Sequence, residues 1–183
     1  MENDLFNIIF SEATKLKIPA VLIGGLALPA FNVARITLDI DICIRVNSQD
    51  LLNQFVNHLE EKDIHTLQKP KLNHDLFLVY GKNCEAEIWL KPCDSFSWDD
   101  QMVDRIEVYT DDIHVLAIED YILTKLARQD RSAIDIDDIL QLLIANKNSI
   151  DSEYLLYRLN WMDLLPDFKK ILDASSIEFE FPS

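Results

Sequence analysis

Basic residues are scarce in this sequence. Seventeen lysines and arginines are outnumbered by 32 aspartates and glutamates, so the formal net charge is −15 at pH 7. Duplex DNA is held largely through neutralisation of its phosphates by lysine and arginine, so the charge argues against duplex DNA as a partner. A nucleotide remains compatible with it, because metal ions and a few local cations can neutralise a triphosphate.

Cysteines are few and long apolar runs are missing. The three cysteines, Cys43, Cys84 and Cys93, have spacings that match neither a zinc knuckle nor a CxxC pair. We expect reduced, structural thiols, as in a cytoplasmic protein. No apolar run approaches the roughly 18–20 residues that span a bilayer, and the acidic start MENDLFNIIF does not resemble a secretory signal. We therefore expect a cytoplasmic protein without a membrane partner.

The hydrophobic pattern predicts an α/β (α+β) fold. Apolar residues make up 49% of the chain, enough for a substantial core. Residues 1–115 are predicted to form a mixed sheet flanked by helices, and residues 116–183 a helical part, with a soft boundary between them. Alternating or buried apolar runs predict strands, and apolar residues at helical spacing predict helices. The expected strands are 20–23, 38–46, 75–80, 85–90 and 105–109, and the first helices are 3–16, 26–34 and one capped by Ser48.

Two carboxylates dominate the strand expected at 38–46. Asp39 and Asp41 are two positions apart, so period-2 alternation places both side chains on one face, while Ile40 and Ile42 point to the core. Adjacent carboxylates repel each other, and burying such a pair is costly without compensation. A divalent cation removes that cost, and Mg²⁺ prefers carboxylate oxygens. One face of the strand is therefore predicted to pack in the core, and the other face to bind a metal ion.

Gly24 and Gly25 lie where the preceding strand is expected to pass into a helix. Glycine allows a ligand to approach the backbone closely, and a helix start presents unpaired N–H groups. Together they predict a cradle for an anion. A phosphate beside a carboxylate metal platform is the geometry of phosphoryl transfer.

A third oxygen ligand is expected from a neighbouring strand. The segment EAEIWL offers Glu85 and Glu87 on one face, with Ile88 and Leu90 directed to the core. Glu87 is preferred because it lies deeper in the strand. The alternative is that Glu87 is an exposed residue without a function.

These residues resemble a known superfamily. An apolar-Gly-Gly turn, a helix and then Arg35-x-Thr37-x-Asp39-x-Asp41 is similar to the DNA polymerase β-type nucleotidyltransferases, and in particular to minimal bacterial members related to abortive-infection and toxin nucleotidyltransferases. A second segment is similar in order. It comprises Glu119, Asp120, Lys125, Arg131, Asp135 and Asp138.

The resemblance implies a role for each matching position. Gly24 and Gly25 would hold the triphosphate of an NTP, and Lys125 would reach a phosphate or the leaving pyrophosphate. Asp39 and Asp41 would bind two Mg²⁺ ions. Glu87 would bind the metal shared with the acceptor and help to take its proton. Arg35 and Thr37 would shape the site around the first aspartate. The family often has Asp at the third position and Gly-Ser at the turn, and both differ here.

The predicted function is transfer of a nucleoside monophosphate from an NTP to an acceptor hydroxyl, with release of pyrophosphate. The acceptor could be a small molecule, an RNA 3′ end or a protein side chain. The alternative is a non-catalytic module of the same fold that binds a nucleotide or a protein, as in a toxin–antitoxin component. A DxD glycosyltransferase is disfavoured, because such a motif normally follows a longer nucleotide-binding half.

Overall fold

The computed structural model describes residues 3–110, 112–175 and 177–181. Its strands are β1 (Ala20–Leu22), β2 (Asp41–Ile44), β3 (His65–Thr66), β4 (Leu76–Tyr80), β5 (Glu85–Trp89), β6 (Glu107–Thr110) and β7 (Ile113–Val115). Its helices are α1 (Asn3–Lys15), the 3₁₀-helix η1 (Gly25–Phe31), α2 (Gln49–Glu60), α3 (Asp100–Asp104), α4 (Ile118–Leu126), α5 (Ala133–Ala145), α6 (Ser152–Trp161) and α7 (Leu165–Ser175).

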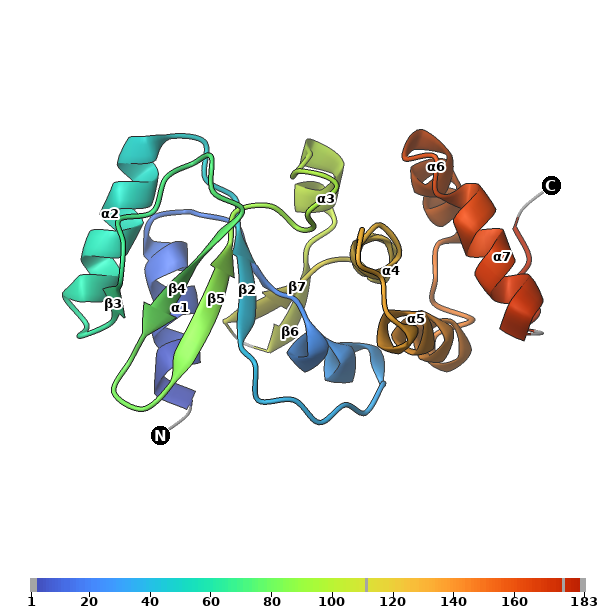
Figure 1. The fold of residues 1–183 in the computed structure, drawn as a ribbon, viewed down its shortest axis with the longest axis horizontal. Coiled ribbons are helices and arrows are strands. Elements are labelled where there is room, and N and C mark those ends of the chain that lie inside the picture. Colours follow the sequence, from blue (N-terminus) through green and yellow to red (C-terminus); the bar gives the residue numbers. More distant parts are fainter. Residues whose placement is uncertain (1–2, 111, 176, 182–183) are drawn as a thin grey trace.

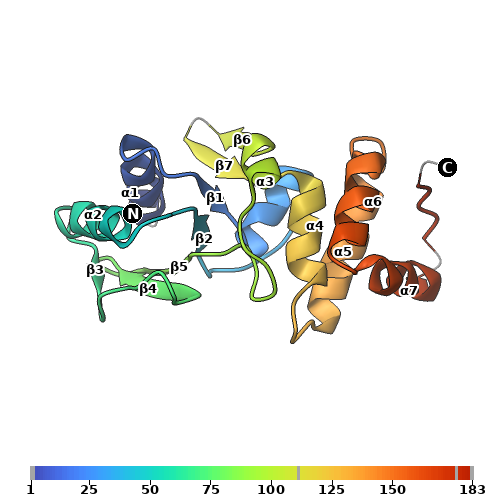
Figure 2. The same ribbon diagram turned by 90° about the horizontal axis from the view of Figure 1, so that it is seen from above.

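The strands form one mixed sheet in the order β3-β4-β5-β2-β1-β7-β6. β1 is antiparallel to β2 and parallel to β7, and β2 is parallel to β5. Helices α1 and α2 lie beside the sheet, and α4 to α7 follow one another away from it along the longest axis of the molecule (Figures 1 and 2). The predicted fold class is confirmed. The division near residue 115 remains a prediction.

The core is continuous between the sheet and the helices. Val21, Ile42 and Ile88 from three adjacent strands are fully buried, as are Leu52 of α2 and Leu123 of α4. These positions follow the two periodicities expected of strands and helices. Burial of one face of each strand leaves the other face of β2 and β5 available for polar side chains.

Several expected elements are confirmed in detail. The Ser48 side chain accepts a hydrogen bond from the Leu51 N–H and caps α2. The first helix ends at Lys15, one residue before its expected end. The short elements β3, α3 and β7 had no counterpart in the sequence prediction. Two or three paired residues leave too little pattern to identify a strand.

The segment 24–46 differs from its prediction in two ways. The helix expected at 26–34 is present but is a shorter 3₁₀-helix, Gly25–Phe31; it contains Pro29, a residue without the N–H that a longer α-helical ladder requires. The expected strand begins only at Asp41, so Asp39 precedes it. Its partner β1 ends at Leu22, and Gly24 then turns the chain with φ +63°. No β1 backbone therefore remains for Asp39 to pair with.

The C-terminal sequence SSIEFEFPS is compatible with either a strand or a loose tail. Its described part, 177–181, forms no strand but packs against α7. The rings of Phe179 and Phe181 lie 5.9 Å and 5.8 Å from that of Phe168. Three aromatic rings at these distances stabilise the end of the helical part.

Candidate active site

Asp41 and Glu87 lie directly opposite each other on neighbouring strands. The parallel register of β2 and β5 pairs Asp41 with Glu87 and Ile42 with Ile88. Paired residues share a face of a sheet, and successive residues alternate between faces. The two partly buried carboxylates therefore lie on one face, and the two isoleucines are fully buried on the other.

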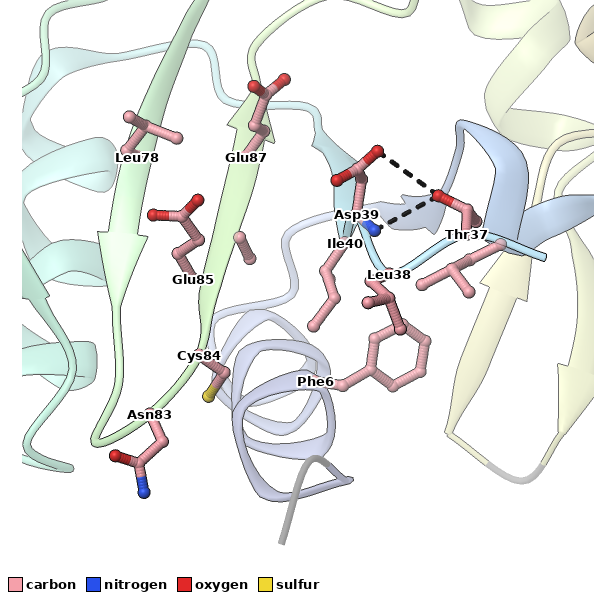
Figure 3. A pocket seen from close by; sticks show the side chains of 12 residues that line it. Phe6, Thr37, Leu38, Asp39, Ile40, Leu78, Asn83, Cys84, Glu85 and Glu87 are labelled. Carbon is pink, nitrogen blue, oxygen red and sulfur yellow. Dashed lines mark hydrogen bonds between the residues drawn. The ribbon is translucent and has the colours of Figure 1, made fainter.

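Asp39 lies beside this pair but on an extended segment, and it is exposed. Its backbone N–H donates to Thr37 Oγ1 at 3.2 Å, and the Thr37 hydroxyl is 3.4 Å from Asp39 Oδ2. Figure 3 shows both contacts. Thr37 thus fixes the approach of Asp39 to the strand that carries Asp41.

The three carboxylates influence each other electrostatically. Burial, followed by the negative charges of Glu87 and Asp39, raises the pKa of Asp41 to about 6. The Trp89 indole and Lys125 oppose this increase in the pKa. Neighbouring carboxylates thus add to the effect of burial on the pKa of Asp41.

The strand register also distinguishes Glu87 from Glu85 as the carboxylate opposite Asp41. Glu85 pairs with Tyr80 at the hairpin end of β5 and is exposed, whereas Glu87 faces Asp41. The Trp89 indole N–H donates to Glu87 Oε2 at 3.1 Å. The spacing of two between Glu87 and Trp89, which places both on one strand face, was the sequence signal for this hydrogen bond.

Both glycines are sites of close approach. A Cβ at Gly24 would lie 2.0 Å from Asp41 Oδ2, and one at Gly25 would lie 2.8 Å from Thr37 Cγ2. Gly24 also has a φ of +63°, a conformation that favours glycine. The Tyr121 hydroxyl donates to the Gly24 carbonyl and ties this turn to α4. The turn is therefore packed directly on the segment that carries the carboxylates.

Lys125 on α4 is buried and held by acids of α5. Its Nζ lies 3.0 Å from Asp138 Oδ2 and 3.7 Å from Asp135 Oδ1. Arg35 Nη1 lies 3.2 Å from the other oxygen of Asp138, and Arg128 Nη1 lies 3.5 Å from Asp135. These ion pairs join the segment before Asp39 to both helices.

The acidic run of α5, which comprises Asp135, Asp137 and Asp138, is a sequence pattern that usually indicates a solvated helix face. That expectation is wrong for Asp135 and Asp138, which are buried, and right for exposed Asp137. The three-residue spacing of Asp135 and Asp138, which places them on one helix face, was the available signal. Their partners come from other elements and could not be identified from that spacing.

Two cavities meet at Glu87. The first, which we call the α4 cavity, measures about 330 Å³ and is lined by Gly24, Asp41, Glu87, Lys125 and Arg128 among others. The second, the hairpin cavity, measures about 490 Å³. It lies between α1, the segment 37–40 and the β4–β5 hairpin (Figure 3).

The donor set fits a hard divalent cation. Carboxylate oxygens are the ligands that Mg²⁺ prefers, and in the described part of the chain Asp39, Asp41 and Glu87 enter no ion pair with a lysine or arginine. The described side chains include no group of three acids, cysteines or histidines already arranged to hold a metal ion. Asp39 precedes the strand, so its side chain would need to turn toward the other two.

The fold is that of a nucleotidyltransferase, with a mixed sheet whose two central strands carry paired carboxylates beside a glycine turn. The chain belongs to the family described as "Nucleotidyl transferase of unknown function (DUF2204)", which it matches over residues 4–163. This confirms the resemblance to the polymerase β-type superfamily. No curated protein is significantly similar to the chain in sequence.

Solved structures support the same fold. The crystal structure of ANT(2″)-Ia with adenylyl-2″-tobramycin matches with a TM-score of 0.55 and 15% identity, covering 87% of this chain and 95% of that one. The solution structure of the antibiotic-resistance factor ANT(2″)-Ia matches with a TM-score of 0.56 and 15% identity, covering 94% of this chain and 93% of that one. The crystal structure of JHP933 from Helicobacter pylori matches with a TM-score of 0.50 and 20% identity, covering 94% of this chain and 76% of that one. At these identities the likeness concerns the fold alone.

Within the described ranges, no helix combines the length and the apolarity needed to cross a bilayer.

Proposed function

We propose that the protein transfers a nucleoside monophosphate from an NTP to an acceptor hydroxyl and releases pyrophosphate. The observation that carries this proposal is the pairing of Asp41 with Glu87 beside Gly24, without a fixed cation among the described residues. Family membership supports nucleotidyl transfer as the type of reaction.

Asp39, Asp41 and Glu87 would hold the divalent ions, with two Mg²⁺ as the best fit, and the bound ions would stabilise negative charge on the phosphates and the acceptor oxygen. Gly24 and Gly25 would hold the triphosphate through their backbone N–H groups, and the lack of a side chain lets Asp41 and Thr37 pack close to this turn. Arg35 and Thr37 position the segment that carries Asp39. Glu87 is the proposed third ligand in preference to Glu85, because the strand register places it opposite Asp41.

Lys125 and Arg128 neutralise the phosphates from the α4 side. Both line the α4 cavity together with Gly24 and Asp41. The acceptor oxygen forms a bond to the α-phosphorus, and the bond between that phosphorus and the pyrophosphate oxygen breaks with its electron pair on pyrophosphate. Glu87 receives the proton of the acceptor hydroxyl and passes it to solvent.

The test is incubation of the protein with Mg²⁺, labelled ATP, CTP, GTP or UTP in turn, and a cell extract. We expect pyrophosphate release and one labelled product with the wild type. Asp41→Asn should lower the rate by at least about a thousandfold, because it removes several kcal/mol of transition-state stabilisation. Asp137→Asn, on an exposed part of α5, is the matched control and should retain the rate.

The outcome also distinguishes the alternative of a non-catalytic module. Nucleotide binding without pyrophosphate release in any extract would favour a binding protein of the same fold. Undiminished turnover by Asp41→Asn would contradict the proposed chemistry directly.

A further inference from the structure

The hairpin cavity differs from the α4 cavity in the side chains that line it. Phe6 of α1, Leu38 of the extended segment and Leu78 of β4 supply apolar surface. Asp39, Glu85 and Glu87 line it as well. Figure 3 shows Glu85 and Glu87 on β5 and the other chain segments around the same hollow. One cavity therefore combines apolar walls with carboxylates.

The charge of the hairpin cavity has a single sign. Its described lining contains no lysine, arginine or histidine. The α4 cavity, in contrast, contains Lys125 and Arg128 beside the acids Asp41, Glu87, Asp94 and Asp130. A phosphate chain in the hairpin cavity would face Asp39, Glu85 and Glu87 without a cation, whereas a positively charged ligand would be attracted by them. The hairpin cavity is therefore the less suitable of the two for a phosphate chain and the more suitable for a cation, and Glu87 lines both.

The apolar part of the hairpin cavity includes unusually exposed surface. Leu38 has 87% of its surface exposed although it lines the cavity, and Phe6 on α1 lies next to it (Figure 3). Contact with a ligand would remove apolar surface of Leu38 from water, which is favourable. A volume of about 490 Å³ lies within the range of small-molecule sites.

We propose that the hairpin cavity binds the acceptor, and that the acceptor is a small molecule with an apolar body, a protonated amine and a reactive hydroxyl. This inference rests on the proposed nucleotidyl transfer. The apolar body packs on Phe6, Leu38 and Leu78, and the amine lies near Glu85. The hydroxyl reaches Glu87, where the two cavities meet. Its oxygen attacks the α-phosphorus, Glu87 takes its proton, and pyrophosphate leaves.

The proposal can be tested by binding alone. Ethanolamine, leucinol and phenylalaninol form a series of amino alcohols with a growing apolar body, and 3-phenyl-1-propanol lacks the amine. Calorimetric titration of the full chain should show affinity that rises along the series. Removal of the amine should weaken binding about tenfold, the effect of losing one partly screened charge interaction.

A matched pair of variants locates the site. Leu38→Lys places a cation in the cavity, and Leu67→Lys places one on a leucine that is 80% exposed and outside both cavities. Neither side chain is buried, so both variants should fold. We expect phenylalaninol to bind Leu38→Lys about tenfold more weakly than the wild type, and to bind Leu67→Lys as tightly as the wild type.

Three results would overturn the proposal: no amino alcohol binds, the two lysine variants behave alike, or the amine contributes nothing. Pyrophosphate release with Mg-ATP separates this failure from failure of the proposed function. Release with a CCA trinucleotide, but without binding of amino alcohols, would reject the amine acceptor and keep the transferase. Binding that is sensitive to Leu38→Lys, without release in any mixture, would reject the transferase and keep only the amine site.

Discussion

The acids of the helical part and those of strands β2 and β5 have different partners. In the helical part, buried Asp120 lies 3.1 Å from Arg158 Nε, and buried Asp138 lies 3.0 Å from Lys125 Nζ. On β2 and β5, Asp41 and Glu87 face each other instead of a basic residue. The chain thus supplies cations where acids join helices, whereas the proposed function assigns the acids of β2 and β5 a cation from outside the chain.

The pKa values of Asp41 and Asp120 illustrate this difference. The pKa of each is raised to about 6, with burial as the largest cause. At Asp41 the next causes are the negative charges of Glu87 and Asp39, which add to the increase. At Asp120 the next cause is Arg158, which opposes it. A similar pKa therefore arises in two settings: after burial, neighbouring carboxylates are the next influence on Asp41, and a buried arginine is the next influence on Asp120.

Removal of the buried cation should have the largest effect on stability. Arg158 has 1% of its surface exposed and contacts both Asp99 and Asp120. Arg158→Ala leaves two acids without their partner, and we expect the free energy of unfolding to fall by about 3–5 kcal/mol. Urea denaturation measures it.

Arg45→Ala is the matched control for this prediction. Arg45 pairs with highly exposed Asp100, so the loss should stay below about 1 kcal/mol. Equal losses in the two variants would remove the distinction between the buried and the surface pair.

Gly24→Ala should destabilise the turn that follows β1 and packs on Asp41. Its Cβ would lie 2.0 Å from Asp41 Oδ2, and its φ of +63° is unfavourable for alanine. We expect a loss of about 2–3 kcal/mol in stability and a displaced Asp41 carboxylate. Gly81→Ala, whose Cβ would lie 3.3 Å from Cys84 Sγ, should cost much less. Thermal unfolding of both variants checks the order, and a tolerated Gly24→Ala would contradict the packing described.

Asp41→Asn should stabilise the protein at neutral pH. The folded pKa of about 6 exceeds the usual 3.8, so the protonated form is favoured in the folded state. Stability from this group is present below about pH 4 and is lost as the pH rises through about 6. The variant should therefore gain about 1–3 kcal/mol over the wild type at pH 7, with the difference shrinking toward pH 4. A variant that is less stable at pH 7 would show that Asp41 is compensated after all.

Asp138→Asn tests whether the ion pairs of Asp138 contribute to nucleotide binding. Lys125 and Arg35 both lose a charged partner, and we expect the Kd of Mg-ATP to rise about tenfold, or about 1.4 kcal/mol, because Lys125 is no longer fixed toward the α4 cavity. Asp137→Asn, at the neighbouring exposed position, should leave the Kd unchanged. Titration calorimetry compares them, and an unaltered or lower Kd for Asp138→Asn would exclude this positioning role.

The sequence predicted what depends on local periodicity. Alternation placed Ile42 and Ile88 in the core and, on the other face, Asp41 and Glu87. The alternation did not predict the position of Asp39. Its N–H donates to the Thr37 hydroxyl, so a local side-chain hydrogen bond replaces the strand hydrogen bonds there. Helix α2 followed the same rule, because its cap by Ser48 is a local feature and was predictable.

Long-range pairing could not be predicted. Arg35 and Asp138 are 103 positions apart, and no local pattern indicates that they meet. The burial of the α5 acids depends on these distant partners, so the sequence alone indicated a solvated face. For the candidate site, the sequence selected the carboxylates and the glycines, while the cavity that lies between them and Lys125 required the fold.

The central claim is that Asp39, Asp41 and Glu87 bind a divalent cation together with a nucleotide. The most direct measurement is calorimetric titration of the wild type and Asp41→Asn with ATP, in the presence of Mg²⁺ and in the presence of EDTA. We predict binding by the wild type only with Mg²⁺, and a loss of at least about tenfold in affinity for Asp41→Asn. Equal binding with EDTA, or equal binding by the variant, would contradict the account.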